Sequence, residues 1–96
     1  MSGKDHLARV HQIPCVVCEL MSIAQKTRTE AHHPEHIRDD SSHYCAIALC
    51  VEHHTGANGV HGLSRRAFAD RYQLSDTKLI ALTIKGLERH GLLRNP

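Results

Sequence analysis

The sequence predicts a small zinc-stapled α+β fold, with two short strands in its first part and helices at its C-terminal end. The first observation is that the 96 residues include one Phe, two Tyr and no Trp, so that the chain can bury only a small apolar core. The second is the presence of four Cys and ten His, the side chains that zinc prefers. The third is that the clearest helical spacing of apolar residues lies near the C-terminus.

Length and composition also bound the number of domains, the compartment and the partners. The length predicts one domain, 1–96, with a part rich in His and Cys at 1–62 and C-terminal helices at 63–96. We see no signal peptide and no stretch long enough to cross a membrane, so we expect a cytoplasmic protein without a membrane partner. Disulfides are rare in a reducing cytoplasm, and paired cysteines there indicate metal ligands. The net charge of +2 permits nucleic-acid binding without requiring it.

The N-terminal part predicts few regular elements. Residues 4–11 are polar with scattered apolar side chains, which fits a short helix or an ordered arm. A tight turn at 13–18 separates two cysteines, and 19–26 fits a helical turn or a loop. Residues 29–33 form a candidate strand that ends in two adjacent histidines, and Pro34 stops it.

A second strand and a short helix are expected next. The charged segment 35–43 predicts a loop, and the apolar run 44–49 has the length of a strand. Residues 50–55 are expected to begin a short helix. The glycines within 56–62 predict a flexible, turn-rich connection.

Two C-terminal helices have clear start signals. Ser64 and Ser75 are expected to cap helices over 65–72 and 76–90, because a serine hydroxyl accepts a hydrogen bond from a free N–H group of the first turn. Gly91 is a plausible end of the second helix. Apolar residues at helical spacing give that helix one buried face, namely Leu79, Ile80, Ile84 and Leu87.

Four residues have the spacing of a structural zinc site. Cys15 and Cys18 form one C-x-x-C pair, and Cys50 and His53 form a C-x-x-H pair about thirty residues later. Each pair comes from a tight turn, so both side chains can converge on one ion and complete a closed tetrahedral site. Thiolates favour zinc over magnesium. Cys45 is interpreted as a small core residue, with a role as fourth ligand in place of His53 as the alternative.

A further group of histidines predicts metal-assisted hydrolysis of a phosphodiester. His32 and His33 are neighbours on a strand and point to opposite faces, so one can bind a metal while the other faces the substrate. The ion stabilises charge on the phosphate, and a neutral imidazole takes a proton from the attacking water. His54 and His61 complete the group. The remaining histidines are interpreted as surface or hydrogen-bonded residues: His6, His11, His36, His43 and His90.

In their order along the chain, these motifs resemble the HNH endonucleases, most closely the phage recombination-enhancement-function (Ref) nucleases. The resemblance covers roughly 13–82. Its motifs are the C-x-x-C, the pair Ala31-His-His33, the segment Ile47-Ala-Leu-Cys-Val-Glu-His-His54, the later His61 and the helix that contains Phe68 and Tyr72. It implies a ββα-metal core, in which two antiparallel strands and a helix surround a catalytic ion.

The resemblance also implies roles for individual residues. His33 is the general base, His32 and His54 bind the catalytic ion, and His61 is a third ligand or a phosphate contact. The four zinc ligands match the structural knuckles of the family. The catalytic ion is expected to be Mg²⁺ or Mn²⁺, with Zn²⁺ or Ni²⁺ as alternatives.

Two positions depart from the pattern of the family. The Asn that usually orients the base is not evident, and His43 or Tyr44 stands nearest to it. The Pro that precedes Leu-Cys in the family is Ala48 in this chain. The first departure concerns the orientation of the base, whereas the second is expected to be tolerated.

Ref nucleases act on DNA together with a RecA recombinase filament. The resemblance therefore implies DNA and such a filament as partners, and a role in recombination or DNA processing for a phage or prophage. Arg38, Arg65 and Arg66 are candidate phosphate contacts, which give affinity without sequence specificity. For any single one of them, an ordinary solvated arginine is the simpler interpretation.

The leading hypothesis is a metal-dependent DNA endonuclease that hydrolyses phosphodiester bonds. The main alternative is a non-catalytic zinc module that binds DNA or protein, which needs the zinc ligands but has no use for His32, His33 and His54. A zinc hydrolase of another substrate is a third possibility, but no carboxylate base such as that of HExxH accompanies the histidines.

Overall fold

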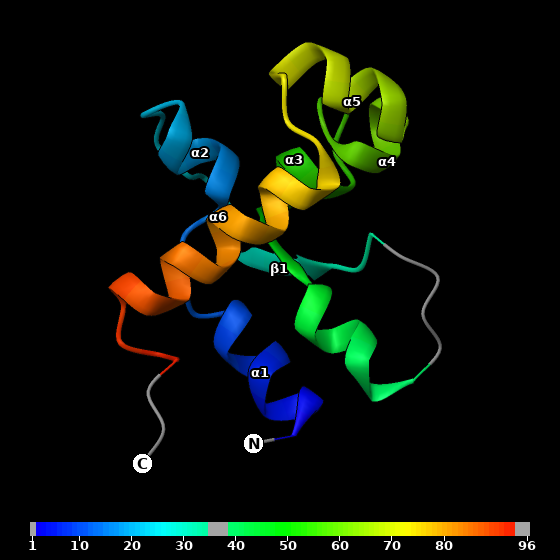
Figure 1. Cartoon of the computed structure of the whole chain (residues 1–96). Helices are drawn as coiled ribbons and strands as arrows, with labels where there is room; N and C mark the ends of the chain where they lie inside the picture. The colour runs from blue at the N-terminus through cyan, green and yellow to red at the C-terminus, as the bar shows by residue number, and fades with distance from the viewer. Residues whose placement is uncertain (1, 35–38, 94–96) are drawn as a thin grey trace.

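The chain forms an α+β fold in which helices surround a two-stranded sheet (Figure 1). The computed structural model describes residues 2–34 and 39–93. The elements are, in order, α1 (Gly3–Val10), α2 (Val16–Leu20), β1 (Thr29–His32), the 3-10 helix η1 (Asp40–Cys45), β2 (Ile47–Cys50), α3 (Val51–His54), α4 (Val60–Leu63), α5 (Arg65–Tyr72) and α6 (Asp76–Arg89). Among the helices of the described residues, none combines the length and apolar character needed to span a membrane.

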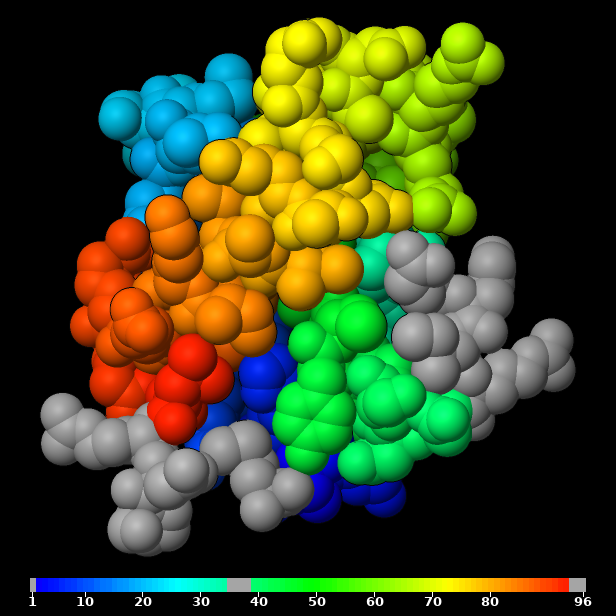
Figure 2. Space-filling model, viewed as in Figure 1, coloured from blue at the N-terminus to red at the C-terminus, as the bar shows by residue number. Residues whose placement is uncertain are grey.

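The sheet places the ends of the two strands beside the later helices. β1 and β2 are antiparallel, with Thr29 opposite Cys50 and His32 opposite Ile47. All four residues of β2 are buried. The backbone N–H of Ala48 donates to Thr83 Oγ1 of α6 at 3.2 Å, which ties the sheet to the longest helix. Figure 2 shows α6 crossing the middle of the molecule, below the segment that contains α2 and the segment that contains α4 and α5.

Both predicted caps of the C-terminal helices are confirmed. Ser64 Oγ accepts from the N–H of Ala67 at 3.2 Å, and Ser75 Oγ accepts from the N–H of Lys78 at 3.1 Å. Helix α6 ends at Arg89, and Gly91 follows with a φ of +71°, a left-handed conformation that glycine adopts without strain.

The N-terminal segment, predicted as a short helix or an ordered arm, is the helix α1. A capping box starts α1: Ser2 Oγ accepts from the N–H of Asp5, whose carboxylate accepts from the N–H of Ser2. His6, expected at the surface or in a hydrogen bond, is instead only 3% exposed, and its Nε2 has no hydrogen-bond partner among the described residues. The reason is that α1 packs against η1, where the ring of Tyr44 lies 5.0 Å from the ring of His6.

The prediction of a loop over 35–43 is wrong for residues 40–43, which belong to η1. Residues 35–38, with His36 and Arg38 among them, lie outside the described residues. Asp39 then caps η1, because its carboxylate accepts from the N–H of Ser41 at 2.9 Å. The strand consequently begins at Ile47 instead of residue 44. Cys45, expected in the core, belongs to η1 and is half-buried.

The connection predicted to be flexible and turn-rich over 56–62 consists of turns and bends up to residue 59, followed by the start of α4, and two of its glycines lie close to other backbone atoms. A Cβ added to Gly59 would lie 2.7 Å from the backbone carbonyl oxygen of His54. A Cβ on Gly62 would overlap the carbonyl group of Gly56. Glycine is needed at Gly59 because the chain passes close to α3 there, and at Gly62 because it passes close to Gly56; α4 also contacts α3.

Candidate metal centres

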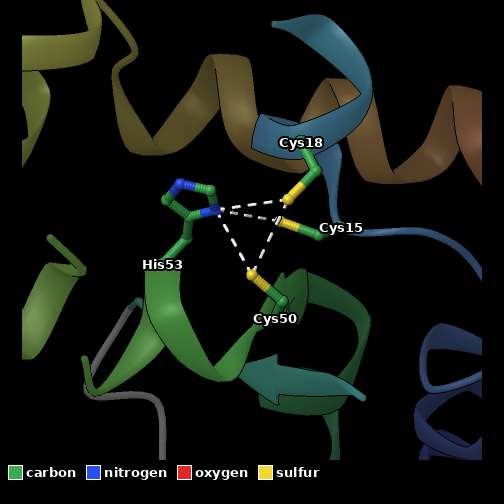
Figure 3. Close-up of side chains that lie close together, drawn as sticks. All are labelled: Cys15, Cys18, Cys50 and His53. Atoms are coloured by element: carbon green, nitrogen blue, oxygen red, sulfur yellow. Dashed lines mark hydrogen bonds between the residues drawn. The ribbon is translucent and has the colours of Figure 1, made fainter. Parts of the chain in front are cut away.

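The four predicted zinc ligands meet in one buried group, the knuckle cluster, shown in Figure 3. The Sγ atoms of Cys15, Cys18 and Cys50 lie 3.5, 3.5 and 3.3 Å from His53 Nδ1. The Sγ atoms of Cys18 and Cys50 are 3.8 Å apart. A tetrahedral zinc ion with Zn–S near 2.3 Å and Zn–N near 2.0–2.1 Å requires S···S edges of about 3.8 Å and S···N edges of about 3.6 Å. The donor atoms therefore already have the spacing of a zinc tetrahedron.

Each half of the knuckle cluster comes from the start of a short helix. Cys15 precedes α2 and Cys18 lies within it, while Cys50 ends β2 and His53 lies on α3. Gln25 holds the first half against the sheet: its Oε1 accepts from the N–H of Cys15 at 2.7 Å, and its Nε2 donates to Thr29 Oγ1 at 2.8 Å. The C-x-x-C turn is thus anchored to β1 as well as to any bound ion.

The electrostatics of the knuckle cluster favour a bound cation. Burial raises the pKa of the Cys15 thiol, and burial together with the neighbouring Cys15 raises the pKa of Cys18 to about 12. Burial also lowers the pKa of His53. The polypeptide alone therefore disfavours thiolates here, and a divalent ion would supply the charge that stabilises them. A closed, buried set of three sulfurs and one imidazole could hold zinc in a structural role. Cys45 takes no part in this set.

A second group, the histidine cluster, consists of His32, His54 and His61. One ring nitrogen from each lies within 4.8 Å of the others, and the ring centroids are 5.0–5.1 Å apart. His32 comes from β1, His54 from α3 and His61 from α4. His32 is buried, His54 is half-buried and His61 is exposed, so the cluster opens to solvent on one side. Three imidazoles with an open side are typical of a metal site that keeps free coordination positions.

The buried member of the histidine cluster has an unpartnered nitrogen. His32 is 3% exposed, and its Nε2 has no hydrogen-bond partner among the described residues. Burial, with smaller effects of His54 and His61, lowers the pKa of His32 to about 4. The ring is therefore neutral at pH 7, and a buried polar nitrogen of this kind needs a partner. A metal ion bound to the three imidazoles would provide one.

The strand predicted over 29–33 ends at His32, and His33 follows directly after it outside the histidine cluster. It is exposed, and its Nε2 lies 3.1 Å from Nδ1 of His43. Partial burial, followed by the effect of His43, lowers the pKa of His33. His43, interpreted as a surface or hydrogen-bonded residue, therefore contacts the predicted base, whereas Tyr44 packs against His6 instead.

Of the predicted phosphate contacts, two lie within the described residues. Arg65 Nη2 lies 2.6 Å from Asp76 Oδ2, which links the starts of α5 and α6. Arg66 is exposed on α5. The ion pair means that Arg65 has a structural contact between α5 and α6. Contact of either arginine with DNA stays a prediction. Arg38 is outside the described residues.

A pocket of about 600 Å³ adjoins the knuckle cluster rather than the histidine cluster. Its walls include Cys18, Cys50 and His53, and apolar residues such as Met21 and Ile23 form part of its rim.

Glu30 and Gln25, which were not predicted as site residues, contact predicted ligands. Glu30 Oε1 lies 3.0 Å from Nδ1 of His54, and Gln25 binds the backbone of Cys15. Glu30 precedes His32 by two residues on a strand, and such residues share one face. That alternation was the available signal for Glu30, whereas the position of Gln25 in an irregular segment offered none.

Comparison of the chain with protein-family models, with curated proteins and with solved structures finds no match.

Proposed function

We propose that the protein is a metal-dependent DNA endonuclease of the HNH type, which hydrolyses phosphodiester bonds with His33 as the general base. The observation that supports this proposal best is the division of roles between two adjacent residues, His32 at the end of β1 and His33 directly after it. His32 turns inward to the histidine cluster, while His33 is exposed and contacts His43. A metal ligand and a base must be separate imidazoles, because a nitrogen that binds a metal has no lone pair left for a proton.

The order of the elements that carry these residues is also the order that a ββα-metal core requires. β1 supplies His32, β2 pairs with it in antiparallel fashion, and α3 follows β2 directly and supplies His54. This arrangement supports the HNH interpretation independently of the sequence motifs, because it depends on strand pairing.

The catalytic ion would be held by His32, His54 and His61. No carboxylate belongs to this cluster within 2–34 and 39–93. Neutral imidazoles suit Zn²⁺ or Ni²⁺ better than Mg²⁺ or Mn²⁺, which prefer oxygen ligands. When bound, such an ion supplies electrostatic stabilisation to the phosphate and to the leaving oxygen.

The chain itself supplies the base and the group that orients it. A lowered pKa keeps His33 neutral at pH 7, so its ring can accept a proton. His43 faces Nε2 of His33, which leaves Nδ1 as the basic nitrogen when Nε2 carries the hydrogen. His43 would thus orient the base in place of the Asn that usually does so in the HNH family. DNA is the proposed substrate; a RecA-type filament and a phage or prophage role in recombination follow only from the resemblance to Ref nucleases.

The main alternative is a zinc module without catalytic activity that binds DNA or protein. The closed knuckle cluster favours it, because such a cluster is complete without any other residue. It leaves the histidine cluster unexplained, and in particular the buried Nε2 of His32 without a partner. We therefore prefer the nuclease.

The test is the nicking of supercoiled plasmid by the purified protein with Mg²⁺, Mn²⁺, Zn²⁺ or Ni²⁺ added in turn. We expect metal-dependent nicking by the wild type and a loss of at least about 100-fold in His33→Ala, since a general base contributes about that much. Zinc content and thermal stability should stay the same. His90→Ala, which removes an exposed imidazole at the end of α6, serves as the matched control. No cleavage with any ion, with or without a RecA filament, would contradict the proposal, as would cleavage by His33→Ala at the wild-type rate.

His43→Ala tests the orientation of the base in the same assay. We expect a loss smaller than that of His33→Ala, because the base remains but its tautomer and ring orientation are no longer held. Zinc content should again be unchanged. Wild-type nicking by this variant would show that His43 does not orient His33.

A further inference from the structure

A carboxylate is held between a ring of the histidine cluster and a guanidinium group. Glu30 lies on β1, where its Oε1 is 3.0 Å from Nδ1 of His54. Its other oxygen, Oε2, accepts from Arg28 Nη2 at 2.9 Å. The side chain of Glu30 is 21% exposed and that of His54 is 16% exposed, so this contact is shielded from water, whereas Arg28 is largely in solvent.

This contact determines which nitrogen of His54 carries hydrogen. An ionised carboxylate only accepts hydrogen bonds, so Nδ1 of His54 must be protonated. In the neutral ring, Nε2 then has the free lone pair, and Nε2 is the nitrogen that His54 can offer to the cluster with His32 and His61. The tautomer required for metal binding is therefore the one that Glu30 selects.

We infer that Glu30 is a positioning residue of the metal site, which fixes the tautomer and the ring orientation of His54, with Arg28 orienting the carboxylate in turn. The inference rests on the metal site of the proposed function. A ligating imidazole commonly donates its other N–H to a carboxylate, which makes it a stronger ligand, and the loss of such a partner costs about 10–100-fold in metal affinity. Without Glu30, the ring of His54 is free to adopt the other tautomer and to rotate.

Two variants separate the hydrogen bond from the charge. Glu30→Val removes the acceptor and keeps a residue that suits a strand. Glu30→Gln keeps an acceptor oxygen but removes the charge, so it should restore part of the lost affinity. Glu52→Ala is the matched control, because Glu52 lies on α3 two residues before His54, and its carboxylate accepts from Asn58 instead of contacting the cluster.

The probe is Co²⁺, added to the zinc-loaded protein and followed by calorimetry and by visible absorption. The absence of a thiolate-to-cobalt charge-transfer band verifies that zinc stays in the knuckle cluster. We expect the wild type and Glu52→Ala to bind Co²⁺ equally and Glu30→Val to bind it about 10–100-fold more weakly. Bound zinc and the melting temperature should not change.

A second readout needs no added metal. In the protein with zinc only in the knuckle cluster, ¹⁵N–¹H spectra of the imidazoles report the tautomer of His54. We expect hydrogen on Nδ1 in the wild type and a mixture of tautomers in Glu30→Val. A merely structural ion pair would change stability but would not couple the tautomer to metal affinity.

The outcomes separate this inference from the proposed function. If the wild type binds no second Co²⁺, the metal site itself is wrong and the inference falls with it. If the wild type binds Co²⁺ and Glu30→Val binds it equally, with hydrogen still on Nδ1, only the role of Glu30 is overturned. Loss of zinc or of the fold in Glu30→Val would likewise overturn it, by making Glu30 structural.

Discussion

The knuckle cluster and the histidine cluster each take one histidine from the short helix α3, yet the first is closed and buried whereas the second is open to solvent on one side. His53 faces three buried cysteines in a closed set, whereas His54, the next residue, belongs to a set with one buried, one half-buried and one exposed imidazole. Neighbouring residues on an α-helix point about 100° apart. A helix of four residues can therefore serve two sites on different sides. A structural site is therefore distinguished from a site with room for a substrate by its burial from solvent and by the type of its donor atoms, rather than by its number of histidines.

The two clusters also differ in what the fold requires of them. The thiols and His53 lie among the buried residues of a core that contains one aromatic side chain, Phe68. An ion there would join α2 to β2 and α3, which are far apart in the sequence. The histidine cluster is at the edge of the same core, where only His32 is buried. Loss of the first cluster should therefore unfold the protein, and loss of the second should not.

The largest expected effect comes from Cys15→Ser. Removing one of four ligands should release the zinc and lower the free energy of unfolding by more than about 4 kcal/mol, a large part of the stability of a small domain. Circular dichroism melts and the measured zinc content check this. The control is Cys45→Ser, since Cys45 is a half-buried cysteine outside the cluster. A Cys15→Ser variant with wild-type zinc content and melting temperature would show that the knuckle cluster does not staple the fold.

A smaller effect on the fold, but a large one on activity, is expected for His54→Ala. The histidine cluster loses one ligand and should no longer hold its ion, so nicking should fall by at least about 100-fold. The zinc of the knuckle cluster should remain, because His53 is unchanged. Metal stoichiometry, nicking rate and melting temperature are measured together. Loss of both ions would mean that the clusters are coupled through α3, and retention of both would remove His54 as a ligand.

The smallest effect concerns His6, a buried imidazole whose Nε2, like that of His32, has no hydrogen-bond partner among the described residues. Burial, with a smaller contribution from Arg9, lowers the pKa of His6 below its ordinary value of 6.5. Above pH 6.5 both the folded and the unfolded chain are neutral at this position. As the pH falls below 6.5, the unfolded chain binds a proton that the folded chain refuses, so stability is lost progressively until the pH reaches the folded pKa.

His6→Phe should therefore make the protein less sensitive to acid, while the ring can still pack against Tyr44. Urea unfolding at about pH 7.5 and pH 5.5 measures the difference in slope between variant and wild type. Acid also weakens metal binding, but it does so in both proteins, and the difference isolates His6. Equal loss of stability in the two proteins would show that burial of His6 does not contribute to the pH dependence.

Several features could be predicted from the sequence because their causes are local. The caps at Ser64 and Ser75 depend on hydrogen bonds over three residues, and both are confirmed. The C-x-x-C and C-x-x-H pairs also depend on short turns, and in the structure their four side chains form one cluster. The prediction for His6 failed because its environment comes from the packing of α1 against η1, which no local pattern indicates. Cys45 was expected in the core but lies in η1, half-buried. The close approach of Gly59 to α3 and of Gly62 to Gly56 was not predicted either.

The C-x-x-C and C-x-x-H pairs, the opposite orientation of His32 and His33, and the C-terminal helices could be predicted from the sequence alone. All three follow from spacings within one turn or one strand, where backbone geometry allows few alternatives. Three features depend on the tertiary structure. His53 rather than Cys45 completes the knuckle cluster. His43 contacts His33, and Glu30 contacts His54. These partners are 10 and 24 residues apart in the last two cases. Contacts at such separations depend on how the sheet, η1 and α3 pack together, and that packing is a property of the whole chain.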